Sequence, residues 1–477
     1  MCMFLLVAAI FAFVERGITE TDIWWHLRNA HSLLQSHSFA RVDTYSFTAA
    51  GFPWMNFEWL SELPFLGAFQ AAGLQGILAV YFVVLVLIFA AVYYRSCGAG
   101  ADCKDAAIAT LAAICLGGVS MAPRTLLFGW LCLVALQLVL DRFNRTGGGL
   151  WLLPPLFALW INLHGSWVFG MVVLAAAIAA GLVEGDWGLV TARRWSPQQL
   201  KKLLLALAVS VAALFINPFG YKLVRYPFDL LFRQQSVMQY IDEWQPVDFG
   251  TVNGKLALAV IFAVLAAALF SRRPWKLDQV MLTGFALWVA LTHVRFLFFA
   301  GLVLAPILAP SLKLFPPYQR ELDKPWLNAG IIGVVVGVIV FSFPSAARLQ
   351  QKVDAEYPVA ALQFMQQQHL KGRILNQYGW GGYMEWYTPE FKPAIDGRAD
   401  LFTYTGIFND LLKATSLKET FEILDKYGIE CVLIPPKQPL GYLLEHSLGW
   451  HLIYSDKVAV LFQRVPAPKP PITQPKQ

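Results

Sequence analysis

The sequence predicts a polytopic α-helical membrane protein that carries one small water-soluble α/β domain at its C-terminal end. Of its 477 residues, 57% are hydrophobic and only 14% are charged, whereas soluble domains average about 25% charged residues. The apolar residues occur in blocks, and the runs Gly76–Tyr94, Trp167–Val183 and Ile331–Phe343 contain no charge. Such blocks are typical of helices that cross a bilayer, which need about 20 mostly apolar residues.

The apolar blocks indicate about eleven membrane-spanning helices within a membrane domain that covers residues 1–345. Two long segments interrupt the blocks, at 17–74 and 217–253, and the soluble domain follows over 346–464. The expected spans are 1–16, 75–94, 105–121, 125–141, 149–164, 167–184, 202–216, 254–271, 277–293, 296–312 and 327–345.

The lysines and arginines of the short loops predict the orientation, because cytoplasmic loops are enriched in these residues. If the N-terminus is cytoplasmic, the short outer turns hold only Arg124 and Arg295. The two long segments and the C-terminal domain then lie outside. The short inner loops hold fourteen basic residues: Arg95, Lys104, Arg142, Arg145, Arg193, Arg194, Lys201, Lys202, Arg272, Arg273, Lys276, Lys313, Arg320 and Lys324.

The C-terminal domain alternates helix-like and strand-like stretches, which indicates a small α/β sandwich. The last two strands are expected to form a hairpin that turns at Asp456-Lys457. Residues 465–477 are rich in proline, lysine and glutamine, so we expect a disordered tail. Helices are expected at 355–370, 417–427 and 440–447, and strands at 373–377, 392–396, 430–435, 450–455 and 458–464.

Composition also narrows the classes of partner. The basic residues are not clustered with aromatic residues on one face, so nucleic acid is not an expected partner. Cys97 and Cys103 share one short loop, but no histidine or second cysteine pair accompanies them, which disfavours a zinc site.

Ionisable residues gather at the outer helix ends, where charge near membrane depth is costly and often functional. Arginine and histidine can hold a phosphate leaving group, while a carboxylate can bind a divalent metal or accept a proton. Structural roles are equally open: Asp22 as a helix cap, Arg124 as a snorkelling side chain, and Asp242-Glu243 as a solvated pair. The candidates are Glu20, Asp22, His26, Arg28, Asp43, Glu58, Glu62, Arg124, Asn162, His164, Asp242, Glu243, His293 and Arg295.

At these residues the chain resembles the GT-C fold of oligosaccharyltransferases, protein O-mannosyltransferases and aminoarabinose transferases. The resemblance lies in a first helix, a long outer segment that opens with an acidic residue, a many-helix body and an outer C-terminal domain. It implies a sugar donor linked to polyprenyl phosphate or diphosphate in the lipid bilayer. It also implies that Asp22, in Glu20-Thr-Asp22-Ile-Trp-Trp-His26, is the catalytic carboxylate.

The chain resembles more closely a poorly characterised bacterial group within or near that fold, which implies a location in the bacterial cytoplasmic membrane. The shared pieces run over almost the whole chain. They are Asp22-Ile-Trp-Trp-His-Leu27, Asp43-Thr-Tyr-Ser-Phe-Thr48, Pro53-Trp-Met-Asn-Phe-Glu58-Trp59, Trp160-Ile-Asn-Leu-His164-Gly165, Trp380-Gly-Gly-Tyr383 and Ile395-Asp-Gly-Arg398.

The chain also departs from the oligosaccharyltransferase pattern. Tyr240-Ile-Asp-Glu243 is similar to the Thr-Ile-x-Glu motif, with tyrosine in place of threonine. Gly379-Trp-Gly-Gly-Tyr383 is similar to the acceptor motif Trp-Trp-Asp-Tyr-Gly but lacks its aspartate. The short turn Met121–Thr125 has no room for an Asp-x-Asp pair, which puts the dependence on Mg²⁺ or Mn²⁺ in doubt.

The resemblance predicts an inverting glycosyltransferase that acts at the outer face of the membrane, with an acceptor of unknown chemistry. The alternative is a membrane scaffold or a transporter of lipid-linked glycans that keeps the architecture without catalysis. In the first case Asp22 is the catalytic residue, and Asp22 and Glu243 are the metal candidates. The donor phosphate ligands are Arg124, His164, His293 and Arg295, and the acceptor contacts are His26, Asp43, Glu58, Trp380 and Tyr383.

Overall fold

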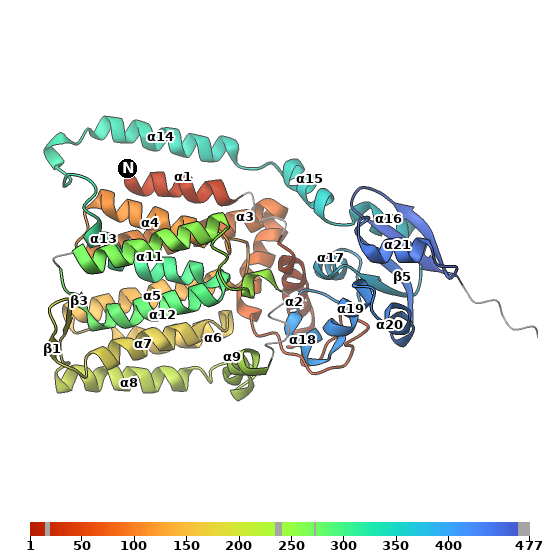
Figure 1. The fold of residues 1–477 in the computed structure, drawn as a ribbon, viewed down its shortest axis with the longest axis horizontal. Helices are drawn as coiled ribbons and strands as arrows, with labels where there is room; N and C mark the ends of the chain where they lie inside the picture. The colour runs from red at the N-terminus through yellow and green to blue at the C-terminus, as the bar shows by residue number, and fades with distance from the viewer. Residues whose placement is uncertain (15–19, 234–240, 271–272, 466–477) are drawn as a thin grey trace, which may run out of the picture. The chain divides into compact units, whose positions relative to one another are not determined.

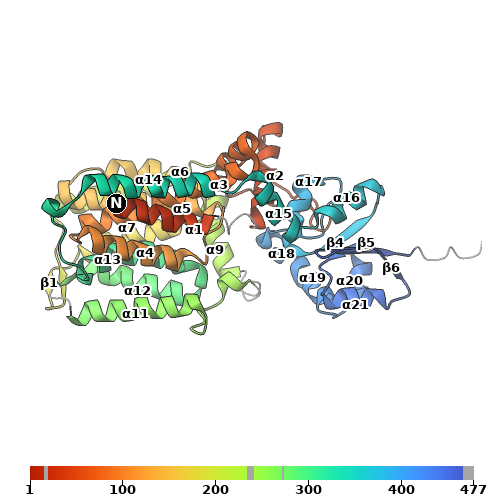
Figure 2. The same ribbon diagram turned by 90° about the horizontal axis from the view of Figure 1, so that it is seen from above.

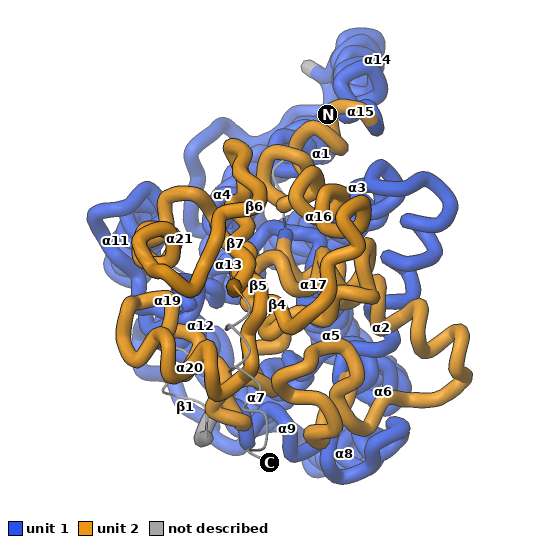
Figure 3. Tube along the Cα trace, turned by 90° about the vertical axis from the view of Figure 1, so that its right-hand side faces the viewer, with its two compact units in different colours: residues 1–20, 57–346 blue, residues 21–56, 347–477 orange. Residues whose placement is uncertain are grey.

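The structure, a computed structural model, describes residues 1–14, 20–233, 241–270 and 273–465. It divides into two compact units (Figure 3), and each is described by itself. Unit 1 comprises residues 1–20 and 57–346, and unit 2 comprises 21–56 and 347–477. Predictions that involve residues 15–16, Tyr240, residue 271, Arg272 and the tail beyond 465 lie outside the described residues.

Unit 1 is a helical bundle in which the helices lie alongside one another (Figures 1 and 2). Each of the eleven predicted spans overlaps a helix of this bundle. The helices are α1 (Cys2–Val14), α3 (Trp59–Gly98), α4 (Cys103–Gly117), α5 (Leu126–Thr146), α6 (Leu153–Leu163), α7 (Trp167–Ala180), α8 (Pro197–Ala213), α9 (Tyr221–Arg233), α11 (Val252–Phe270), α12 (Leu277–Thr292), α13 (Leu297–Leu312) and α14 (Pro325–Ser342).

Unit 1 exposes many large apolar side chains on its helices, which indicates a multi-pass membrane protein. Among the described residues, five helices are long and apolar enough to cross a bilayer, and four shorter helices are apolar. Val335 is the one buried residue of α14, and Phe341 is 91% exposed. An apolar helix without a protein partner on most of its surface requires a lipid environment.

Helix α13 lies at the centre of the bundle, and nearly every residue from Leu297 to Ala309 is buried. A helix that is apolar all round is expected in such a position. Its close approach to α4 depends on a small residue, because a Cβ added at Gly301 would lie 3.1 Å from the Cα of Ala113. Small residues at helix contacts are typical of membrane bundles.

Helix α3 begins earlier than the sequence predicted, at Trp59 instead of residue 75. Its first turns contain Ser61, Glu62 and Pro64, which obscure the apolar pattern. The helix bends at Gly73, whose φ of +57° is a left-handed conformation that glycine adopts without strain. The polar segment 17–74 is therefore largely helical, since it also contains α2 (Asp22–Ser36).

Short 3-10 turns, among them η5 (Arg320–Leu322), and a small sheet complete unit 1. The turns η3 (Asp242–Trp244) and η4 (Val294–Phe296) are joined by a hydrogen bond from the Val294 amide to the Gln245 carbonyl at 2.9 Å. A further 3-10 turn, η2 (Leu150–Leu152), precedes α6. The sheet consists of β1 (Gly185–Asp186), β2 (Val190–Ala192) and β3 (Trp275–Lys276).

Unit 2 contains a four-stranded sheet with the order β4-β5-β7-β6. Strands β4 (Arg373–Asn376) and β5 (Ile429–Ile434) are parallel, while β7 (Val460–Arg464) pairs antiparallel with β5 and with β6 (Trp450–Ser455). The hairpin predicted at the end of the domain is present as β6 and β7. The helices are α2, α15 (Ala346–Glu356), α16 (Val359–Gln367), α17 (Gly381–Tyr387), α18 (Ala399–Tyr404), α19 (Ile407–Thr415), α20 (Thr420–Lys426) and α21 (Pro439–Glu445).

Two predicted elements of unit 2 were wrong. The helix expected at 355–370 is two helices, because Pro358 disfavours helical backbone at Tyr357 and ends α15. Residues 392–396 form an isolated bridge from Pro393 to Ile374 and not a strand. The Asn376 side chain takes the place of a strand ladder, since it accepts from the Ala394 amide at 2.8 Å and donates to the Ile395 carbonyl at 2.8 Å.

Residues 21–56 belong to unit 2 because α2 buries an aromatic face there. Trp24 is fully buried and meets the rings of Tyr357 and Tyr383 edge-on, at centroid distances of 5.7 and 5.1 Å. Glycines allow α17 to pack closely, because a Cβ added at Gly382 would lie 3.1 Å from the Trp25 backbone nitrogen. The Trp-Gly-Gly-Tyr motif therefore fits α17 against α2.

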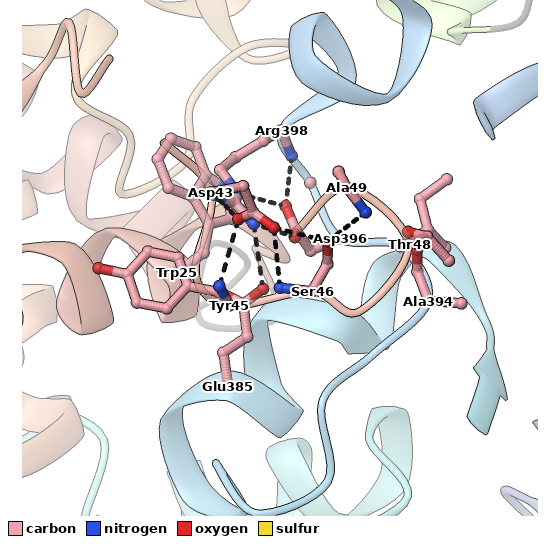
Figure 4. A network of polar contacts seen from close by, with 12 residues as sticks. Trp25, Asp43, Tyr45, Ser46, Thr48, Ala49, Glu385, Ala394, Asp396 and Arg398 are labelled. Atoms are coloured by element: carbon pink, nitrogen blue, oxygen red, sulfur yellow. Dashed lines mark hydrogen bonds and ion pairs between the residues drawn. The ribbon is translucent and has the colours of Figure 1, made fainter. Parts of the chain in front are cut away.

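A buried arginine ties the loop after α2 to the segment before α18 (Figure 4). The Arg398 guanidinium binds Asp396 at 2.6 Å and Asp43 at 2.7 Å, and all three side chains are at most 1% exposed. Asp43 also accepts from the amide and hydroxyl of Ser46, at 3.1 and 2.7 Å. The aromatic ring of Trp54 lies 4.8 Å from the guanidinium carbon, within the range of a cation–π contact.

Glu385 is the third carboxylate of this network, 3.5 Å from Arg398. Burial, together with the neighbouring Asp396, raises the pKa of Glu385 well above its ordinary value. Burial alone would also raise the pKa of Asp396, but the Arg398 guanidinium outweighs it and lowers that pKa. Within the network, Asp396 therefore ionises more readily than usual and Glu385 keeps its proton to higher pH than usual.

The raised pKa predicts that Glu385 makes unit 2 less stable as the pH rises. The folded state keeps this proton above pH 4.5, the ordinary pKa of the group, where the unfolded chain has lost it. Stability then falls by up to about 1.4 kcal/mol per pH unit until the folded pKa is reached. The lowered pKa of Asp396 adds stability that is lost only on acidification, so it does not oppose this trend above pH 6.

We expect Glu385→Gln, which keeps the shape without the ionisation, to flatten this pH dependence between pH 6 and 8. Hydrogen exchange of peptides covering residues 395–402 in the full-length protein, corrected for intrinsic rates, reports the opening free energy. Glu390→Gln, at an exposed site on the same unit, should behave as wild type. Equal pH dependence in wild type and Glu385→Gln would contradict the assignment.

Candidate functional site

The predicted site residues are divided between the two units. Unit 1 holds Glu58, Arg124, His164, Glu243, His293 and Arg295, and unit 2 holds Asp22, His26, Asp43, Trp380 and Tyr383.

Arg124 joins three segments of unit 1 that are far apart in the sequence. It lies in the turn between α4 and α5, and its Nε lies 2.8 Å from a carboxylate oxygen of Glu20, which follows α1. Its Nη1 lies 2.6 and 2.5 Å from the two carboxylate oxygens of Glu243 in η3. The Arg124 side chain is 21% exposed. Its charge is thus already balanced by two carboxylates.

Glu58 connects the start of α3 to the turns beside it. Its carboxylate accepts from the Thr125 hydroxyl at 2.8 Å and contacts His164 Nε2 at 3.0 Å. Two further bonds fix the same region: Trp59 Nε1 donates to Asn162 Oδ1 at 2.9 Å, and the Ser61 hydroxyl donates to the Leu163 carbonyl at 2.7 Å. Glu58 is 6% exposed, which indicates a structural role instead of the predicted acceptor contact.

The hydrogen bonds of His164 define its protonation. Nδ1 accepts from the Ser166 amide at 2.9 Å, so it carries no proton, and Nε2 must then be the nitrogen that donates to Glu58. A neutral imidazole with both nitrogens engaged cannot offer a charge or an N–H to a phosphate. His164 therefore fits a role in holding Glu58 better than the predicted contact with the donor.

Arg295 in η4 and His293, which precedes η4, both contact Trp244 of η3. The guanidinium carbon of Arg295 is 4.4 Å from the centre of the Trp244 ring, and His293 meets the same ring edge-on at 5.5 Å. The Arg295 carbonyl accepts from the Ser120 hydroxyl at 3.1 Å, which joins η4 to the turn that carries Arg124. Stacking on tryptophan orients a guanidinium plane while leaving its edge available for hydrogen bonding.

These contacts form one connected group at a single end of the bundle, which we call the Arg124 cluster. Its arginines and histidines are those that the sequence analysis selected as phosphate ligands. The helix ends that carry them come together because ionisable groups are excluded from the apolar part of the bundle. The members are Glu20, Glu58, Arg124, Thr125, His164, Glu243, Trp244, His293 and Arg295.

Asp22 is the first residue of α2 and is half-buried. The Trp25 indole donates to its Oδ1 at 3.3 Å. Asp22 also packs against the Asp-Gly-Arg motif, since a Cβ added at Gly397 would lie 2.3 Å from Oδ1. Only glycine at position 397 leaves room for this carboxylate. The Asp-Gly-Arg motif therefore helps to position Asp22, in addition to its role in the Arg398 network.

The remaining candidates of unit 2 are largely buried. His26 is 2% exposed and stacks on Trp25 at a centroid distance of 3.6 Å. Trp380 donates to the Glu356 carbonyl at 2.9 Å, Tyr383 stacks on Tyr357 at 4.7 Å, and Asp43 is bound to Arg398. These contacts give Asp43, Trp380 and Tyr383 structural roles, and their acceptor contacts stay a prediction that would require the unit to open.

The residues predicted to bind a metal do not fit a divalent ion. Mg²⁺ and Mn²⁺ take oxygen ligands that converge on one point. Within the described ranges, no three histidine, cysteine, aspartate or glutamate side chains are grouped closely enough to hold an ion. Both carboxylate oxygens of Glu243 are also taken by Arg124. No step of a reaction is therefore assigned to a metal here.

Three members of the site were missed by the sequence analysis. Glu20 was noted but given no role, although it lies two residues before Asp22. Trp244 follows Glu243 directly, and an aromatic residue beside a polar turn is a usable signal for stacking on arginine. Gly397 belongs to the Ile395-Asp-Gly-Arg398 motif, but its close approach to Asp22 cannot be inferred without the tertiary structure.

Comparisons with known proteins find similarity in structure and not in sequence. No protein-family model matches the sequence, and no curated protein matches it. The apo oligosaccharyltransferase of Archaeoglobus fulgidus aligns with a TM-score of 0.51 and 12% identity, over 90% of this chain and 69% of that one. Apo ArnT from Cupriavidus metallidurans aligns with a TM-score of 0.51 and 14% identity, over 97% of both chains.

A second ArnT structure from Cupriavidus metallidurans, bound to undecaprenyl phosphate, aligns with a TM-score of 0.48 and 13% identity, over 97% of both chains. At such identities the apo structures establish the architecture and not the chemistry. The fold expected from the sequence motifs is confirmed, and the chain has the GT-C fold.

Proposed function

We propose that the protein is a glycosyltransferase that takes a sugar from a polyprenyl-phosphate-linked donor at the outer face of the membrane. The Arg124 cluster carries the proposal, because it gathers arginine, histidine and carboxylate side chains at one end of an apolar bundle. A lipid carrier delivers its phosphate to that depth, where cations are otherwise costly. The GT-C fold is consistent with this activity but does not define it.

Arg295 is the proposed principal ligand of the donor phosphate, with His293 beside it. Its guanidinium carbon lies 4.4 Å from the centre of the Trp244 ring, which orients the guanidinium plane. A planar guanidinium can bind two phosphate oxygens at once and stabilise the charge that develops on them.

Asp22 is the proposed catalytic carboxylate. In an inverting transfer it would accept the proton of the acceptor hydroxyl as the acceptor oxygen bonds to the anomeric carbon. The bond from that carbon to the phosphate oxygen breaks, and the leaving phosphate keeps the electron pair. The half-buried position of Asp22 and the long hydrogen bond from the Trp25 indole, at 3.3 Å, are compatible with a carboxylate that can accept a proton.

Asp22→Asn should lower transfer by about 10²–10⁴-fold, the usual contribution of a general base. Stability should change by less than about 0.5 kcal/mol, because the amide keeps the shape and an oxygen that can accept from Trp25. The assay is transfer of radiolabelled sugar from a membrane lipid extract by purified protein, with Asp354→Asn as an exposed control in the same unit. Wild-type activity in Asp22→Asn would remove Asp22 from the mechanism.

Arg295→Ala should weaken donor binding while leaving transfer measurable at high donor concentration. Loss of one charge-assisted hydrogen bond costs about 1.5–3 kcal/mol, or roughly 10- to 150-fold in the concentration that gives half-maximal rate. Donor binding by Arg295→Lys should be weaker than in wild type and stronger than in Arg295→Ala, because lysine keeps the charge but not the planar stack on Trp244. An unchanged dependence on donor concentration, like that expected of the distant control Arg145→Ala, would exclude Arg295 from the phosphate site.

The outer-face location predicts opposite labelling of two introduced cysteines in intact cells. Lys202 is exposed in unit 1 and Leu448 is fully exposed in unit 2, so neither change should disturb packing. In a background with the six native cysteines replaced, a membrane-impermeant maleimide should label Leu448→Cys, and it should label Lys202→Cys only after permeabilisation. The reverse pattern would overturn the orientation.

A further inference from the structure

Two carboxylates from distant segments converge on the Arg124 guanidinium. Glu20 follows α1 and Glu243 lies in η3, yet their oxygens lie 2.8 Å from Nε and 2.6 and 2.5 Å from Nη1. The Glu20 side chain is 7% exposed and that of Glu243 is 22% exposed. Without a cation between them, two partly buried carboxylates would repel each other.

Convergence of carboxylates from separate segments is also the usual way in which proteins hold a divalent ion. Here the position between the carboxylates is taken by a side chain that remains charged at every physiological pH. The turn that carries Arg124 is also too short for a further pair of acidic ligands, as its sequence Met121-Ala-Pro-Arg-Thr125 shows.

We infer that Arg124 is a built-in cation that takes the place of a divalent metal between Glu20 and Glu243. Arg124 is then a positioning residue: it fixes η3, and through Trp244 of η3 it fixes the plane on which Arg295 stacks. The ion pairs are made by the chain itself, so this part of the inference does not depend on the proposed transfer activity.

The inference predicts how η3 responds to loss of the cation and to added Mn²⁺. Hydrogen exchange of peptides covering residues 242–252 in the full-length protein is the readout. In wild type, neither EDTA nor Mn²⁺ should change exchange. Arg124→Ala should speed exchange by at least about tenfold, since a partly buried ion pair worth roughly 1.4 kcal/mol or more is lost. Arg124→Lys, which keeps the charge, should restore most of the protection.

Millimolar Mn²⁺ should restore protection in Arg124→Ala, because the two carboxylates can then share the ion, but not in Arg124→Ala/Glu243→Gln. Failure of Mn²⁺ to restore protection in Arg124→Ala would contradict the inference. So would unchanged exchange in that variant.

Wild-type protein also tests the inference directly, even if Arg124→Ala does not fold. In a titration, free Mn²⁺ is measured by its paramagnetic resonance signal. Wild type and Glu243→Gln should bind the same amount of Mn²⁺, because wild type has no saturable site that involves Glu243. A wild-type Mn²⁺ site that disappears in Glu243→Gln would overturn the inference, while leaving the proposed glycosyl transfer standing. If wild-type protein shows no transfer activity and also no Mn²⁺ site, the proposed function is contradicted but the role of Arg124 is not.

Discussion

The constraint on which the structure depends is that charge cannot remain uncompensated in an apolar bundle. Most of the surface of α14 and much of that of α11 is exposed and apolar, so these faces need lipid. Ionisable side chains are therefore confined to the helix ends, where each must find a partner. The Arg124 cluster is the result at one end: its arginines, histidines and glutamates hold turns that are short and have little packing of their own.

Three arginines meet this constraint in different ways. Arg398 is buried among Asp396, Asp43 and Glu385, and its side chain is 1% exposed. It joins separate parts of unit 2 and has no surface for a ligand. Arg124 is partly exposed and compensated by two carboxylates, while Arg295 stacks on an aromatic ring. The buried Arg398 therefore has a structural role, while the proposed phosphate ligand Arg295 is oriented by an aromatic ring.

Much of the fold could be predicted from the sequence, because the apolar blocks that form the bundle are long and free of charge. The strand pairing at the end of unit 2 could also be predicted, since both strands of the hairpin alternate around a clear turn at Asp456-Lys457. The start of α3 could not, because Glu62 and Pro64 interrupt a helix whose polar residues are buried by tertiary contacts. The same limit applies to residues 392–396, where the Asn376 side chain replaces backbone pairing.

The candidate site was predicted in its residue types but not in its partners. The sequence indicates that Arg124, Glu243, His293 and Arg295 lie at outer helix ends, and the structure brings these four together. It cannot indicate that Glu243 is bound to Arg124, that His164 contacts both Ser166 and Glu58, or that Asp43 is bound to Arg398. Except for the local bond to Ser166, these contacts join segments that are separated by about 100 or more residues in the sequence.

The most direct test of the account is the fate of the carrier in a single-turnover reaction. Purified wild-type protein in liposomes would be mixed with a membrane lipid extract whose sugars are radiolabelled, and the carrier phosphate and the label would be followed separately. The account predicts that label leaves the polyprenyl carrier for an acceptor in step with the appearance of unglycosylated polyprenyl phosphate. Saturable binding of labelled lipid without release of the carrier phosphate would contradict catalysis and favour a scaffold or transporter.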